Sequence, residues 1–218
     1  MIYAPPPHTG HNILYQDKYL LVINKPSGLL SVPGRGEEKQ DCLISRLQVE
    51  YPDALIVHRL DMSTSGLMMI ARGKEIERAL SILFQKREVK KKYIAIVSGR
   101  LKEKQGRIDV PIITDWPNRP KQKVDWLDGK PSITDYSVFS YDSKKNTSTV
   151  DLQPVTGRTH QLRLHLKQIG HAILGDELYA TMEVIKQSKR LLLHACYLSF
   201  KHPVTSEIIE LNAKAEFQ

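Results

Sequence analysis

The turn from His58 to Gly66 places a carboxylate, Asp61, beside a guanidinium, Arg59, in a polar segment between two apolar runs. These runs, residues 55–57 and 67–71, are short and bounded by turn-forming residues, which favours buried strands over helices. Asp61 is then expected to project from a loop on a rigid scaffold, where reactive groups are often placed. A carboxylate here could equally cap or shape the turn, together with the neighbouring hydroxyl side chains. On spacing alone, that structural role explains Asp61 better.

A catalytic Asp61 would have to be ionised and correctly aimed near neutral pH. A forked guanidinium can do both, because it forms two charge-assisted hydrogen bonds to a carboxylate. Arg158, expected at the mouth of a helix, is the candidate partner. An exposed helix-start residue or a phosphate contact is the alternative role for Arg158.

Other site chemistries fit the sequence less well. His160 and His165 share an expected helix but are five residues apart, whereas two metal ligands on one helical face need three or four, so we expect hydrogen-bonded histidines instead. Ser63 and Ser65 lack the sequence of a nucleophile elbow, and residues 25–28 lack a full phosphate-binding loop. The sequence therefore favours carboxylate chemistry with neither a metal nor a cofactor.

The overall charge favours a nucleic-acid partner. Lys and Arg number 32 against 24 Asp and Glu, which gives a net charge of +8 and a pI near 9.4. Such an excess attracts polyanions through counterion release. The basic residues cluster in residues 86–92, 119–123 and 186–190.

Composition also indicates the cellular compartment in which the protein is expected. Cys42 and Cys196 show no ligand or redox spacing, so we expect free thiols in a reducing cytoplasm. No apolar run approaches the roughly 18–20 residues that span a bilayer, and the amino terminus does not resemble an export signal. We therefore expect a cytoplasmic protein that does not enter a membrane.

Apolar periodicity predicts an α+β fold with a mixed, largely antiparallel sheet and flanking helices. Residues 1–12 are rich in proline and are expected to form a flexible arm, and residues 13–218 a single domain. A long surface loop is expected over residues 115–130. Helices are predicted from an N-cap at Asp41 to about 50, over 74–86, and from 156–159 to Gly170. Strands are predicted over residues 13–15, 19–24, 55–57, 67–71, 93–97, 107–113, 133–141, 149–154, 191–200 and 207–211.

Several motifs together resemble one family. His58-Arg59-Leu60-Asp61 followed by Thr64-Ser65-Gly66 resembles the signature of pseudouridine synthases of the large-subunit ribosomal type. Residues 24–28, 92–93, 156–163 and 173–176 are similar to further family motifs and follow in the family order. Residues 115–123 are similar to the family member that acts on both rRNA and tRNA. The resemblance implies the pseudouridine synthase catalytic fold, without a separate N-terminal RNA-binding domain.

The resemblance implies a cofactor-free reaction in which a uridine is detached from its ribose at N1, rotated and rejoined through C5. Asp61 is then the catalytic carboxylate, whether it attacks C1′, attacks the base or removes a sugar proton to give a glycal. Arg158 is expected to pair with Asp61. Tyr93 is expected to lie against the uracil and to help remove the C5 proton, or only to stack, because a free phenol has a pKa of about 10.

The resemblance also implies how RNA is held. The target nucleotide must be flipped out of its stack, at a cost of a few kcal/mol. Arg59 is expected to take the place of the flipped base, Arg119 and Lys121 to bind phosphates, and Leu174 to form an apolar pocket wall. The expected substrates are large-subunit rRNA and a tRNA anticodon stem-loop, bound by a monomer.

Three alternatives remain open at this stage. A related synthase could modify other ribosomal uridines, and a non-catalytic RNA-binding protein could share the fold. An N-glycoside hydrolase could also use a carboxylate, although such enzymes more often need a second one. The hydrolase would release free uracil, which separates it from a synthase.

Overall fold

The computed structural model describes residues 3–217, which fall into two compact units. The first unit contains the chain up to Lys91 and returns with His194–Glu216, whereas the second contains Lys92–Leu193 and Phe217. The chain crosses between units within strands β5 (Lys90–Ser98) and β11 (Leu193–Lys201). Residues 1 and 2 of the expected arm, and residue 218, lie outside the described residues. A single catalytic domain over residues 13–218 stays a prediction.

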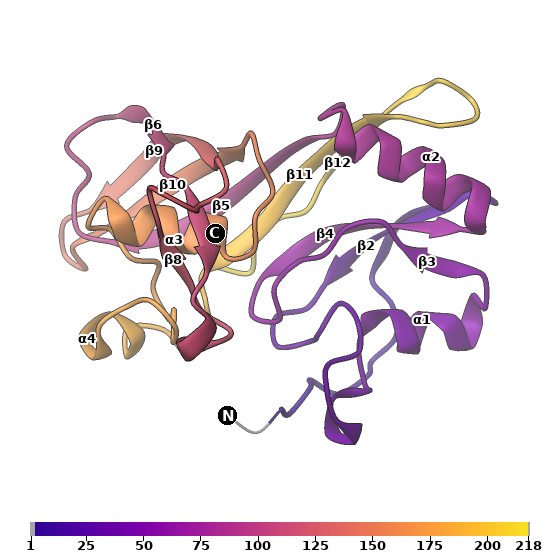
Figure 1. The fold of residues 1–218 in the computed structure, drawn as a ribbon, viewed down its shortest axis with the longest axis horizontal. Coiled ribbons are helices and arrows are strands. Elements are labelled where there is room, and N and C mark those ends of the chain that lie inside the picture. Colours follow the sequence, from indigo (N-terminus) through magenta and orange to yellow (C-terminus); the bar gives the residue numbers. More distant parts are fainter. Residues whose placement is uncertain (1–2, 218) are drawn as a thin grey trace. The chain divides into compact units, whose positions relative to one another are not determined.

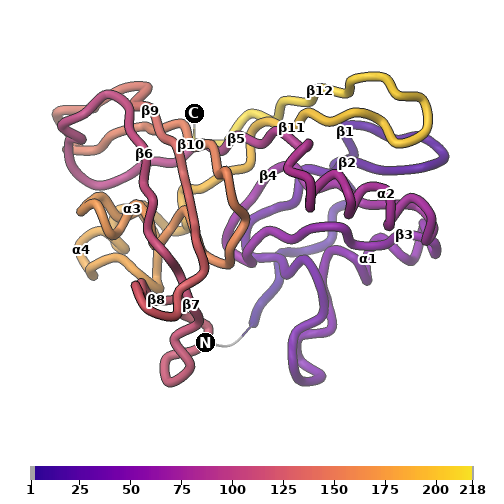
Figure 2. The backbone as a smooth tube through the Cα atoms, turned by 45° about the horizontal axis from the view of Figure 1, so that its top comes forward, coloured from indigo at the N-terminus to yellow at the C-terminus, as the bar shows by residue number. Residues whose placement is uncertain are grey.

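Strand β4 (Ser65–Arg72) organises the first unit. It pairs antiparallel with β2 (Leu20–Lys25) and β3 (Ala54–Ile56), and parallel with the start of β11. Strand β1 (Ile13–Gln16) extends this set beside β2, and β12 (Ile208–Asn212) runs antiparallel to β11, as Figure 2 shows.

Helices cover both faces of these strands because β2 and β4 are apolar at almost every position. Leu80 of α2 (Lys74–Gln85) packs with alternate residues of the two strands, including Val22 and Met69. Figure 1 shows α1 (Leu43–Glu50) on the opposite side of the strands from α2. The loop before α1 contains the 3₁₀ turn η1 (Glu37–Lys39).

The N-cap predicted for α1 is wrong by one residue. Cys42 occupies the N-cap, and its backbone N–H donates to Ser45 Oγ at 3.0 Å. Asp41 instead forms a two-pronged ion pair with Arg46, at 2.6 and 2.7 Å. The preference of Asp for N-caps is thus overridden by a nearby guanidinium.

The second unit contains a four-stranded antiparallel set in the order β5, β10 (Thr147–Pro154), β9 (Ile133–Asp142) and β6 (Gln105–Asp109). Helix α3 (Gln161–Gln168) packs its Leu162 and Leu166 against Val97 and Leu152 of this set. The other elements of the unit are strands β7 (Ile112–Thr114) and β8 (Gln122–Val124), the 3₁₀ turn η2 (Trp116–Asn118) and the short helix α4 (Met182–Ile185).

Three boundaries in the second unit differ from prediction. The strand expected over residues 107–113 breaks at Pro111, which has no N–H for a strand ladder. Residues 115–130 are not all loop, because β8 pairs with β7 as a small hairpin. Helix α3 starts at Gln161 rather than at 156–159, since His160 takes a left-handed conformation with φ 55°.

The predicted α+β fold is confirmed, with pairings within each unit antiparallel except that of β4 with β11. Neither Cys42 nor Cys196 forms a disulfide among the described residues, in agreement with the prediction. Among residues 3–217, no helix is both long enough and apolar enough to cross a bilayer.

Candidate active site

Asp61 lies in the loop that connects β3 to β4, and its side chain is half-buried. The N–H of Thr64 donates to the Asp61 carbonyl at 3.1 Å and closes a tight turn behind it. Leu60, just before, is buried and anchors the loop: Ser31 Oγ donates to its carbonyl at 2.8 Å. The turn predicted around Asp61 is therefore present in the first unit.

The buried side chain of Lys25 supports the loop that carries Asp61. Lys25 has 0% exposure, and its ammonium lies within 2.8–3.2 Å of the carbonyl oxygens of Pro26, Leu29 and Met62. The Gly28 N–H also donates to the Met62 carbonyl, at 2.8 Å, and Ser27 Oγ donates to the Ser63 carbonyl at 2.7 Å. Residues 24–28 are thus the support for the loop that carries Asp61. In sequence, residues 24–28 resemble a family motif, but nothing there indicates that they support the Asp61 loop.

Gly66, which ends the signature motif, permits a close approach between strands. Its φ is +116°, and β4 and β11 pair at Gly66 and Ala195. A Cβ at this position would lie 2.3 Å from the Ala195 carbonyl oxygen. Only glycine fits this backbone conformation and this gap.

We predict that Gly66→Ala lowers the free energy of unfolding by about 3 kcal/mol or more, because strain at positive φ and a backbone clash add together. Gly73→Ala is the matched control: its φ is +82°, but a Cβ there meets nothing within 4 Å. We expect that change to cost only about 1 kcal/mol. Urea unfolding measures both, and equal losses would contradict the close-approach explanation.

His58 lies near the start of the loop that carries Asp61, and two contacts hold its ring in place. Its Nε2 accepts the Met69 N–H at 2.9 Å, and its ring lies 4.5 Å from the Phe84 ring. Burial, with a smaller effect from the positive charge of Lys91, lowers the pKa of His58 to about 3. The imidazole is therefore neutral at pH 7, with its proton on Nδ1 because Nε2 is an acceptor.

This lowered pKa makes stability depend on pH. An unfolded histidine has a pKa of about 6.5, so between pH 6.5 and 3 unfolding takes up a proton. The contribution of His58 is complete above pH 6.5 and decreases as the pH falls toward 3. We predict an imidazole NMR spectrum of neutral, Nδ1-protonated His58 at pH 5, and a weaker pH dependence of stability for His58→Gln. A His58 titration with a midpoint near pH 6 would contradict this.

Ser65 and His194 form a buried polar contact behind the loop. Ser65 Oγ lies 2.8 Å from His194 Nδ1, and His194 Nε2 lies 3.1 Å from the Ala213 carbonyl. The carbonyl requires the proton on Nε2, so Ser65 donates to Nδ1. Ser65 thus links β4 to β11 and to the chain after β12.

Tyr93 and Arg158 belong to the second unit. Tyr93 lies on β5 opposite Leu152 of β10 and packs half-buried against the core of that unit. The Arg158 side chain is exposed, and its Nε lies 3.4 Å from the Pro131 carbonyl. Pairing of Arg158 with Asp61 stays a prediction.

Gln161 shapes the turn that presents Arg158. Its Oε1 accepts the Thr156 hydroxyl at 2.7 Å and the Arg158 N–H at 3.0 Å. Its Nε2 donates to the Ile133 carbonyl at 2.9 Å, which fixes the turn to β9. Sequence reasoning missed this role because the contact of Gln161 with Ile133 on β9 depends on the tertiary fold.

A buried ion pair joins two further motifs of the second unit. Arg163 on α3 binds both carboxylate oxygens of Asp176, at 2.6 and 2.9 Å, and the two side chains are 3% and 1% exposed. Asp176 also accepts the Leu178 N–H at 3.0 Å. Leu174, two residues before Asp176, is buried, and its backbone bonds Ile96 and Leu192. The segment with Leu174 is therefore tied firmly to α3.

His160 and His165, whose spacing does not suit metal binding, are hydrogen-bonded, as predicted. His160 Nδ1 lies 2.8 Å from the Tyr179 hydroxyl. His165 contacts Thr134 Oγ1 at 2.9 Å and the Val110 carbonyl at 3.0 Å. Burial lowers the pKa of His165, which favours its neutral form.

The predicted RNA-binding cations are accessible to different degrees. Arg59 and Arg119 are exposed, and Lys121 is half-buried beside β8. The Arg119 guanidinium lies 4.7 Å from the ring centroid of Trp116, which is itself exposed. A cation stacked on an exposed indole at a hairpin end is a surface suited to RNA.

Comparison with known proteins identifies the family of this chain. Residues 19–168 match the model of the RNA pseudouridylate synthase family, which covers more than half of the chain. The chain belongs to this family and is an RNA pseudouridine synthase, an isomerase. The fold and activity expected from the motif resemblance are confirmed.

Particular relatives are similar over nearly the full length. The chain is 50% identical over 215 residues to dual-specificity RNA pseudouridine synthase RluA of Escherichia coli K12, covering 99% of this chain and 98% of that protein. The protein of the same name from Vibrio parahaemolyticus is 52% identical over 204 residues, covering 92% of this chain and 82% of that protein. Among solved structures, human RNA pseudouridylate synthase domain containing 1 has a TM-score of 0.81 at 29% identity, covering 99% of this chain and 87% of that chain.

Proposed function

We propose that this enzyme converts uridine to pseudouridine in both large-subunit rRNA and a tRNA anticodon stem-loop. The observation that carries the proposal is the 50% identity to a synthase named for dual specificity, over 99% of this chain. The net charge of +8 supports a polyanionic substrate. The enzyme works as a cytoplasmic monomer.

Asp61 is the catalytic carboxylate in this proposal. The N1–C1′ bond of the uridine breaks, the base turns, and a C5–C1′ bond forms as the C5 hydrogen leaves and N1 gains one. The product is an isomer of the substrate, so no oxidant or reductant is consumed. The rigid support of the Asp61 loop by Lys25 and Ser27 suits a group that must be held in one geometry.

Tyr93 and Arg158 assist Asp61. Arg158 pairs with the carboxylate and keeps it ionised, while Tyr93 lies against the uracil. Leu174 forms an apolar wall for the base, and its firm backbone bonding to Ile96 suits that role. The buried environment of such a wall keeps water from the reacting atoms.

RNA is held mainly through charge and shape. Arg59 fills the gap left by the flipped nucleotide, and its exposure suits a side chain that enters the RNA stack. Arg119 and Lys121 bind phosphates, which set the register of the RNA without reading its sequence. The single catalytic domain over residues 13–218 belongs to the same proposal.

A competition experiment tests dual specificity. Transcripts of the rRNA helix and of the tRNA stem-loop are each incubated with the enzyme, and pseudouridine is mapped. We expect product in both, with each RNA inhibiting modification of the other at an inhibition constant equal to its own KM. Product in rRNA at other uridines, with none in the tRNA, would instead indicate a related synthase of different specificity.

A further inference from the structure

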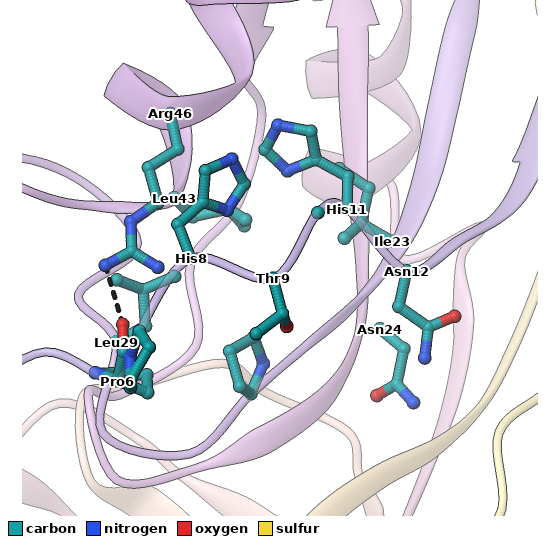
Figure 3. A pocket seen from close by; sticks show the side chains of 13 residues that line it. Pro6, His8, Thr9, His11, Asn12, Ile23, Asn24, Leu29, Leu43 and Arg46 are labelled. Atoms are coloured by element: carbon teal, nitrogen blue, oxygen red, sulfur yellow. Dashed lines mark hydrogen bonds between the residues drawn. The ribbon is translucent and has the colours of Figure 1, made fainter.

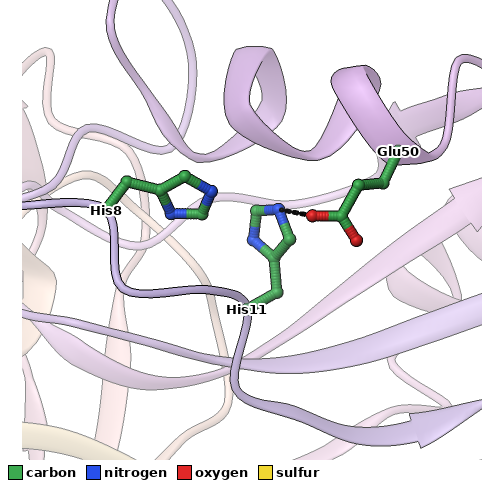
Figure 4. A group of neighbouring side chains, drawn as sticks. All are labelled: His8, His11 and Glu50. Atoms are coloured by element: carbon green, nitrogen blue, oxygen red, sulfur yellow. Dashed lines mark ion pairs between the residues drawn. The ribbon is translucent and has the colours of Figure 1, made fainter.

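The N-terminal arm brings two histidines to the end of a helix. His8 and His11 lie on the arm, and Glu50 is the last residue of α1. One ligand atom from each of these three side chains lies within 4.8 Å of the other two. Figure 4 shows the His11 imidazole between the His8 ring and the Glu50 carboxylate, with a dashed line for the His11–Glu50 ion pair, and all three residues belong to the first unit.

His11 has an unsatisfied nitrogen at the centre of this group. Its side chain is only 5% exposed, and its Nε2 has no hydrogen-bond partner among the described residues. Glu50 Oε1 lies 3.4 Å from this nitrogen. A buried nitrogen without a hydrogen bond is costly, so an additional ligand there would be favourable.

The chemistry of the group fits a borderline transition-metal ion. Two imidazoles and one carboxylate form a common ligand set for Zn²⁺ that leaves a fourth position for water. The C-terminal end of α1 also carries partial negative charge, which favours a cation.

The surroundings allow the ligands to close around an ion. Zinc ligands stand roughly 3.3 Å apart when the bonds are about 2.0–2.1 Å, so ligand atoms that lie within 4.8 Å of one another need to move in by at most about 1.5 Å. His8 and its neighbours Thr9 and Gly10 are exposed, and a Cβ added at Gly10 would meet no atom within 4 Å. An adjacent pocket of about 160 Å³, lined by His8, His11 and Asn24 among others, has room for a water ligand (Figure 3).

We propose that His8, His11 and Glu50 bind one Zn²⁺ ion, which clips the arm to α1. Protein contacts already hold the arm on either side of the histidines. Arg46 donates to the Pro6 carbonyl at 2.8 Å, and the Asn24 N–H donates to the Asn12 carbonyl at 2.9 Å. The ion fastens the exposed stretch between these points.

The proposed zinc site lies close in the chain to the residues that support the Asp61 loop. Asn24, which the arm bonds, begins the segment whose Lys25 and Ser27 hold Met62 and Ser63. Zinc acts there as a structural ion and takes no part in the isomerisation. Its binding is therefore measurable without RNA.

Calorimetric titration of the full chain with Zn²⁺ tests the proposal. We expect one ion to bind with micromolar affinity, and His8→Ala and Glu50→Gln each to weaken binding by about tenfold or more. His171→Gln, a change at a histidine of the second unit, is the matched control and should bind as the wild type does. Mg²⁺ should not bind, because it prefers oxygen ligands.

Imidazole NMR provides a second readout of the same site. One equivalent of Zn²⁺ should shift the ring signals of His8 and His11 in the wild type and not in Glu50→Gln. Wild-type affinity in His8→Ala, or a first equivalent that shifts only other histidines, would overturn the proposal.

Discussion

Asp61→Asn is expected to reduce pseudouridine formation by about 10³-fold or more while RNA binding stays nearly unchanged. Asparagine keeps the size and hydrogen-bonding geometry of the side chain but cannot act as a nucleophile or base, and such groups contribute roughly 10²–10⁴-fold or more. The loop itself should survive the change, since its support comes from backbone contacts to Lys25 and Ser27. Single-turnover mapping of product and filter binding of RNA measure the two effects.

Asp53→Asn is the matched control for this prediction. It removes the same charge from the same unit, at an exposed side chain that pairs with Arg72 at 3.1 Å. Loss of a surface pair costs only about 0–1 kcal/mol, so activity should stay near that of the wild type. If the two variants lose activity equally, the role of Asp61 is general charge rather than catalysis.

The second large effect is expected at the buried ion pair of the second unit. Asp176→Ala leaves the Arg163 guanidinium in the interior without its carboxylate, and Arg163 is 3% exposed. Breaking a buried pair from one side costs about 3–5 kcal/mol, because the remaining buried charge loses the carboxylate that neutralises it. Chemical denaturation of the purified variant measures the loss.

The exposed pair Arg107–Asp135 supplies a control of nearly the same geometry. Its contacts are 2.7 and 3.0 Å, but its side chains are 61% and 38% exposed. Asp135→Ala should therefore cost only about 0–1 kcal/mol, since water screens the pair and solvates the arginine that remains. A similar loss in both variants would show that burial does not determine the value of Arg163–Asp176.

The elements with strong apolar periodicity were predictable from sequence. Helix α2 is expected over residues 74–86 and observed over 74–85, because Ile76, Leu80 and Leu83 recur at helical spacing and bury one face. The hairpin of β7 and β8 was not predictable, since its strands are three residues long and lie among prolines and basic residues. Local pattern gives little signal for so short a pair.

The candidate site was predictable in its motifs but not in its supports. Asp61 stands out by family motif, whereas Lys25 gives no sign in sequence that its ammonium is enclosed by three carbonyls. Lysine is almost never fully buried, so the sequence alone predicts an exposed side chain at this position. The pairing of Arg163 with Asp176 likewise depends on a tertiary contact between separate motifs.

The ligand group at the N-terminal arm also could not be predicted from sequence. His8 and His11 are three residues apart, but Glu50 joins them only through the placement of the arm beside the end of α1. His160 and His165, in contrast, are five residues apart and bind Tyr179 and Thr134. Spacing excludes that pair of histidines, but only the fold brings Glu50 to His8 and His11.

Release of tritium from RNA labelled at C5 of uridine tests the central claim most directly, because the isomerisation replaces the C5 hydrogen with the bond to C1′. The wild-type enzyme should release label to water in step with pseudouridine formation, and Asp61→Asn should release almost none. Undiminished release by Asp61→Asn, or liberation of free uracil that retains its label, would contradict an Asp61-dependent synthase.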